Sequence, residues 1–199
     1  MKLSPKSLLV AVIFVVLIVG YYWYLSNCNV SSAEAKPDLT EGQMVITEDL
    51  DGNYPSTPRE VVKFYNRLLL CYYNEEYTEE ELEAMVDQAM KLFDEDLISQ
   101  NPRDQYLGDL KVDIASYRAD GKTISNITIA GSKDVRYETL GADDCAYVDC
   151  VYYTREGSSF AAIPQTYMLR KDENGKWKIL AFFLTPNEGN GTGNENSGD

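Results

Sequence analysis

The sequence has no histidine among its 199 residues. Histidine is the commonest protein ligand of transition metals and the commonest general base, so its absence removes the usual basis of a metalloenzyme or a hydrolase. No pair of cysteines has the spacing of a zinc site or a redox motif either. We therefore expect no metal ion and no cofactor.

Cysteine is also scarce, and the four present are Cys28, Cys71, Cys145 and Cys150. An even number in an exported chain permits disulfides without requiring them. Cys71 falls in a helical pattern and is expected to be a buried, small apolar residue. Cys145 and Cys150 lie five residues apart on one predicted strand, too far to bond each other unless the chain bends there.

Basic residues are few: the chain has 18 Lys and Arg against 32 Asp and Glu. Two of the bases, Lys2 and Lys6, precede a long apolar run, and every acid follows it, so the part beyond the run carries a net charge of −16. Nucleic-acid binding needs clustered cations, which are missing, so we exclude it. Anionic headgroups would also repel this part of the chain.

The apolar run extends from Leu8 to Leu25 without a charged residue. As a helix it would reach about 27 Å, which is enough to span a bilayer. Aromatic residues at 21–24 suit the headgroup layer at one end, and Lys2 and Lys6 flank the other. We predict a single-pass protein of the cell membrane, with residues 1–7 in the cytoplasm, a transmembrane helix at 8–25 and an extracellular C-terminal domain.

Two other interpretations of this segment remain open. A cleaved signal peptide usually has a shorter apolar region and a small-residue cleavage site, which the aromatic cluster does not provide. A bacterial lipoprotein is a closer alternative, because Leu25-Ser26-Asn27-Cys28 resembles a lipobox that would place a lipid on Cys28. Asn27 departs from that pattern, which requires a small residue before the cysteine. Either anchor would hold the domain on the outer side of the membrane.

The remaining chain divides by composition. Residues 26–55 are polar and acidic, which predicts a flexible spacer. Residues 187–199 form a Gly- and Asn-rich tail that we expect to be disordered. One globular domain is predicted between them, at 56–186.

Three amphipathic helices are predicted in the first half of this domain. Thr57-Pro58 begins the first, which continues to residue 73, because a cap residue is followed by Pro at the first helical position. Thr78 begins the second, and Asn101-Pro102 the third, which ends near Gly121. In the third segment, alternating apolar residues would also permit a strand, although the helical period fits better.

Beyond Gly121 the apolar period falls to two, which is typical of strands. We predict strands at 124–129, with a possible extension to 137, and at 146–155, 160–170 and 177–184. Turn sequences around Gly157 and Gly175 predict antiparallel hairpins, and Pro164 predicts a sheet edge or a bulge. The expected fold class is α+β, with about three helices packed on a curved antiparallel sheet of four or more strands.

This order of elements resembles the NTF2-like, cystatin-like superfamily. The likeness rests on the capped helix at 57–73, the strand entry Asp143-Asp144-x-Ala146-x-Val148, and the segment at 172–179, DENGKWKI. The resemblance implies helices inside the hollow of a bent sheet and a conical pocket. It is strongest to uncharacterised, membrane-anchored bacterial members, and it transfers no functional residue.

Aromatic side chains are the candidates for lining such a pocket. Tyr65, Tyr152 and Tyr167 are the candidates to line it, and Trp177 is the candidate to close it. Aromatic residues at these spacings usually fill a core, so ordinary core packing is the interpretation that we favour. An enzyme is not expected, because the candidate acid Asp149 should point to solvent and has no second catalytic group beside it.

We therefore expect a non-catalytic module in the cell envelope that binds another envelope protein or a second copy of itself. The alternative function is a receptor that binds a small ligand in the conical pocket.

Overall fold

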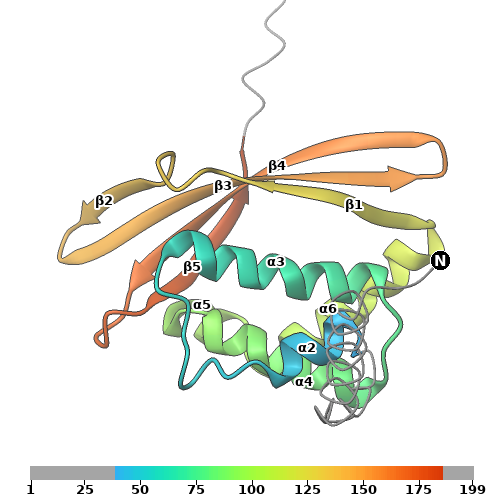
Figure 1. The fold of residues 1–199 in the computed structure, drawn as a ribbon, viewed down its shortest axis with the longest axis horizontal. Coiled ribbons are helices and arrows are strands. Elements are labelled where there is room, and N and C mark those ends of the chain that lie inside the picture. The colour runs from blue at the N-terminus through green and yellow to red at the C-terminus, as the bar shows by residue number, and fades with distance from the viewer. Residues whose placement is uncertain (1–38, 186–199) are drawn as a thin grey trace, which may run out of the picture. The chain divides into compact units, whose positions relative to one another are not determined.

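The computed structural model describes residues 39–185. They form an α+β fold in which five helices cover one face of a five-stranded antiparallel sheet (Figure 1). The predicted fold class is confirmed at this level. The predicted segments at 1–7, 8–25 and 187–199 lie outside the described residues, as does Cys28. Within residues 39–185, no helix combines the length and apolarity that a membrane span requires.

The three predicted helices are confirmed. They correspond to α3 (Pro58–Asn74), α4 (Glu79–Leu92) and α6 (Arg103–Ala119). The hydroxyls of Thr57 and Thr78 accept hydrogen bonds from backbone amides of the first turns of α3 and α4, as the cap residues predict. Gly121 follows α6 with a φ of 62°, the left-handed conformation that glycine adopts readily. A short helix that the sequence did not predict, α5 (Glu95–Gln100), connects α4 to α6.

The predicted spacer at 26–55 is wrong in its second half. Residues Glu41–Thr47 form helix α2, which contacts α3 and α4. Val45 is fully buried, and Leu50 is 1% exposed. Arg67 of α3 forms ion pairs with acids at each end of α2 and so connects it to the domain. The folded unit therefore begins near Thr40, because a few apolar side chains in a polar segment are enough to dock one short helix.

The sheet is built around one long strand, β3 (Asp143–Glu156). Its neighbours are β1 (Lys122–Ile129) and β2 (Arg136–Leu140) on one side and β4 (Ser159–Lys171) on the other, and β4 in turn pairs with β5 (Trp177–Leu184). The chain does not continue as one strand to residue 137. Instead, β1 pairs with the C-terminal half of β3 and β2 with its N-terminal half. We refer to the part of the sheet around the C-terminal half of β3 as its distal half.

Both predicted hairpins are present, with Gly157 and Gly175 at positive φ in their turns. Pro164 lies at the point where β4 is no longer paired with β5, because the pairing of these two strands begins at Gln165. The predicted edge position is therefore confirmed. Alternate residues of β3, including Val148 and Tyr152, are buried against the helices, as the period of two requires.

The three described cysteines are free and buried. Cys71 is fully buried in α3, as predicted. Cys145 and Cys150 lie on the same strand and form no disulfide with each other, which confirms the expectation from their spacing.

Candidate ligand cleft between the helices and the sheet

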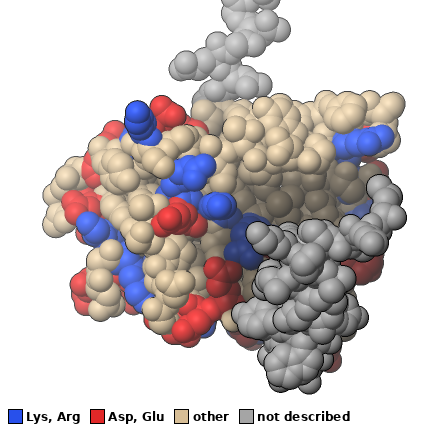
Figure 2. Space-filling view, viewed as in Figure 1, with Lys and Arg blue, Asp and Glu red and all other residues tan. Residues whose placement is uncertain are grey.

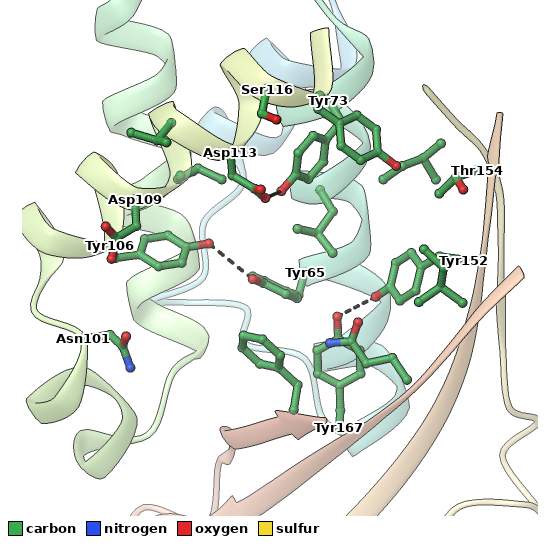
Figure 3. A pocket seen from close by; sticks show the side chains of 18 residues that line it. Tyr65, Tyr73, Asn101, Tyr106, Asp109, Asp113, Ser116, Tyr152, Thr154 and Tyr167 are labelled. Carbon is green, nitrogen blue, oxygen red and sulfur yellow. Dashed lines mark hydrogen bonds between the residues drawn. The ribbon is translucent and has the colours of Figure 1, made fainter. Parts of the chain in front are cut away.

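An open cleft of about 750 Å³ lies between helices α3 and α6 and the distal half of the sheet. Figure 3 shows its three walls: Tyr65 on α3, Tyr106 and Asp113 on α6, and Tyr152 and Tyr167 on the strands. The volume falls within the range of pockets that hold small organic ligands, about 300–1,000 Å³.

Three tyrosines form the floor of the cleft. Tyr65, Tyr152 and Tyr167 line it, and each side chain is at most 5% exposed. The rings of Tyr65 and Tyr167 meet edge to face, with 5.9 Å between their centroids. The structure thus brings together three of the four residues that the sequence predicted for a pocket.

Hydrogen bonds hold the floor hydroxyls in place. The hydroxyl of Tyr152 donates to Oδ1 of Asn66 at 2.5 Å, and the hydroxyls of Tyr152 and Tyr167 are 2.5 Å apart. The hydroxyl of the third floor residue, Tyr65, lies 3.2 Å from the hydroxyl of Tyr106 on α6. Burial raises the pKa of Tyr65 and of Tyr167 well above the usual value for a phenol. These hydroxyls therefore remain neutral at physiological pH.

The rim on the α6 side is polar and acidic. Asp109, Asp113 and Ser116 follow one another at helical spacing on the face of α6 that lines the cleft. The hydroxyl of Tyr73 donates to Oδ2 of Asp113 at 2.5 Å. Burial raises the pKa of Tyr73, and the hydrogen bond to Asp113 raises it further. On the sheet side, the rim is apolar and includes Ile163 and Phe182.

Trp177, the fourth predicted residue, does not line the cleft. It begins β5 at the other end of the sheet, where its ring lies 5.8 Å from that of Tyr137 and beneath the ammonium group of Lys171. Its backbone carbonyl accepts a hydrogen bond from Tyr54. Trp177 is buried, as the interpretation of core packing expects, but its position relative to the cleft depends on the pairing register, which the sequence does not show.

Helix α6 contributes side chains to the cleft that the sequence did not predict. Tyr106 and Asp113 complete the cleft, and Val112 is 72% exposed on its rim. The available signal was the mixed pattern of this helix, which carries acids at 109 and 113 and apolar residues at 110 and 112 between them. Such a pattern indicates a face that is incompletely covered, but it does not show which element lies opposite.

Asp149 is half-exposed and lies outside the cleft, as its position in the alternation predicted. Its carboxylate accepts hydrogen bonds from Thr166 and Arg136. Among residues 39–185, no three His, Cys, Asp or Glu side chains are grouped closely enough to hold a metal ion.

The model of a domain of unknown function, DUF6715, matches residues 1–182, which include the apolar run and nearly all of the described domain. No curated protein matches the chain. Because this match covers most of its length, the chain belongs to the family defined by that domain of unknown function, DUF6715.

Proposed function

We propose that this protein is a membrane-tethered, extracytoplasmic receptor domain that binds a small organic ligand in the cleft. The observation that carries the proposal is the open space of about 750 Å³ over a floor of ordered tyrosine hydroxyls. A core that served only for stability would fill this space with side chains, since protein interiors are close-packed. Apolar walls with a few convergent polar groups are typical of ligand pockets.

The tether is proposed from the apolar run at 8–25 and the lysines before it. The family match supports it, because one model includes both this run and the domain. A lipid on Cys28 is the alternative anchor and would leave the domain on the same side of the membrane.

We further propose that the domain is NTF2-like. Support comes from the layer of helices on one face of the sheet and from β4 and β5, which form the closing hairpin around Gly175.

Binding without catalysis is proposed because the acid singled out in the sequence, Asp149, lies outside the cleft. The buried tyrosines of the floor are held neutral, which suits hydrogen bonding to a ligand better than proton abstraction at neutral pH.

The test is a screen of neutral, cationic and anionic small molecules by saturation-transfer NMR on the full chain in nanodiscs of zwitterionic lipid. Ser116 lines the cleft on α6, so Ser116→Trp should place an indole in the space and abolish binding. Ser99→Trp is the matched control, because Ser99 is an exposed helical serine outside the cleft. Binding that survives Ser116→Trp, or a screen without any binder, would contradict the proposal.

A second candidate function is the protein-interaction module, favoured by the end of β5. Phe182, Phe183 and Leu184 are each at least 45% exposed. They pair with β4 on one side of β5, and on the other side no strand of residues 39–185 pairs with them. Figure 2 shows a mostly uncharged surface where Figure 1 places the distal half of the sheet, with one basic patch near its right end. Exposed apolar residues at a free edge are a common site of strand addition. Crosslinking from Phe183 in native membranes would reveal a partner, whereas an empty result and a monomeric chain would exclude this role.

A further inference from the structure

We propose that the cleft selects an organic cation with an apolar body, such as a substituted ammonium compound. The inference rests on the proposed function, because it names the chemical class of the ligand. It follows from the charges, the aromatic rings and the arrangement of the bases around the cleft.

The charge of the cleft is carried by two carboxylates. Asp109 and Asp113 lie on its rim, and none of the described residues that line it is Lys or Arg. Because burial keeps the tyrosine hydroxyls neutral, they do not change this balance at physiological pH. An anionic ligand would lose hydration and gain no positive partner from the lining, whereas a cation would gain two opposite charges.

Helix α6 separates its charges by face. Its three basic residues, Arg103, Lys111 and Arg118, all form ion pairs with acids of α4 or of the loop before it. Asp109 and Asp113 instead lie at i and i+4 on the face toward the cleft. The bases that could neutralise these two carboxylates are therefore held on the other side of the helix.

The aromatic rings suit the same ligand. Six tyrosines and Phe182 line the cleft. Neutral phenol rings attract cations through their faces, and the interaction is strongest where water is partly excluded. The hydrogen bond from Tyr73 holds the carboxylate of Asp113 beside these rings. One cationic head could thus contact a ring face and a carboxylate together, while the rest of the ligand packs against Leu69 and Ile163.

The test uses three probes with one apolar body and three charges: 4-phenylbutyl-trimethylammonium, 4-phenylbutanol and 4-phenylbutyrate. Dissociation constants are measured by calorimetry on the full chain in nanodiscs of zwitterionic lipid, with empty discs as the baseline. We expect the ammonium probe to bind about tenfold more tightly than the alcohol, and the carboxylate most weakly.

Two double variants, each of which removes two negative charges, distinguish the effect of the cleft carboxylates on binding from the effect of the protein's overall negative charge. In Asp109→Asn with Asp113→Asn, we expect the preference for the ammonium probe to fall to about twofold or less. In Glu95→Gln with Asp104→Asn, it should persist, because these exposed acids lie outside the cleft. Circular dichroism verifies that both variants are folded.

Equal affinity for the three probes, or equal loss of preference in both double variants, would overturn the inference about charge. Neither result would contradict the proposed function of a small-ligand receptor. If no probe binds and the screen yields no compound sensitive to Ser116→Trp, the proposed function fails together with the inference.

Discussion

At the scale of single residues, the tyrosine hydroxyls of the cleft floor determine how the domain responds to alkali. Burial raises the pKa of Tyr65, Tyr152 and Tyr167 above the value near 10 that a tyrosine has in the unfolded chain. Above that pH the unfolded chain releases protons that the folded domain retains. The free energy of unfolding should therefore be constant from this source below about pH 10 and fall above it, by about 1.4 kcal/mol per pH unit for each tyrosine.

Urea unfolding at a series of alkaline pH values measures this slope, and tyrosinate absorbance shows whether the folded domain has ionised. Tyr152→Phe should make this slope less steep by the contribution of one tyrosine, about 1.4 kcal/mol per pH unit. Tyr153→Phe is the matched control for loss of a hydroxyl, because Tyr153 is the next residue on β3 and is 40% exposed. Exposed tyrosines such as Tyr153 also ionise in this range, so the parent chain and Tyr152→Phe are compared. A smaller tyrosinate absorbance in Tyr152→Phe before unfolding would show that Tyr152 ionises in the folded domain, contrary to the prediction.

At the scale of elements, α2 is the part of the structure that most alters the domain predicted from the sequence. If residues 26–55 were all spacer, a small change at Val45 would have no effect on stability. Because Val45 is fully buried against α3 and α4, we expect Val45→Ala to lower the free energy of unfolding by about 1.5–3 kcal/mol. Val112→Ala makes the same change on α6 at a side chain that is 72% exposed, and it should alter stability by less than about 0.5 kcal/mol.

Both values come from urea unfolding of the two variants and the parent chain. A stability change for Val45→Ala no larger than that for Val112→Ala would mean that α2 does not contribute to the folded unit.

The elements that could be predicted are those with local signals. Thr57 and Thr78 cap their helices with side-chain atoms a few residues away, and Gly157 and Gly175 form turns that need positive φ. These are short-range requirements that a sequence displays directly. The α2 helix carries such a signal too, since Thr40 and Gln43 form a capping box, but it has only seven residues and its stability depends on docking.

The cleft was predictable only in part for the same reason. Alternation indicated that Tyr152 faces inward, and helical periodicity indicated the same for Tyr65, and both are buried. Trp177 lies outside the cleft because of the strand register, and α6 lies over the cleft because of helix packing. Both depend on contacts between segments that are far apart in the sequence. No local pattern in the chain encodes them.

At the scale of the whole molecule, the anchor decides where a receptor could meet its ligand. If residues 8–25 span the membrane with Lys2 and Lys6 inside, protease added to protoplasts should digest the domain, whereas protease added to inverted vesicles should spare it.

The variant Cys28→Ser then distinguishes a transmembrane anchor from a lipid anchor. A spanning helix keeps the variant in the membrane fraction, because about 18 apolar residues suffice without a lipid. A lipoprotein would lose its incorporated palmitate, and the variant would not be processed to begin at residue 28. Protection of the domain in protoplasts would place the cleft in the cytoplasm and contradict the extracytoplasmic receptor, whichever anchor holds it.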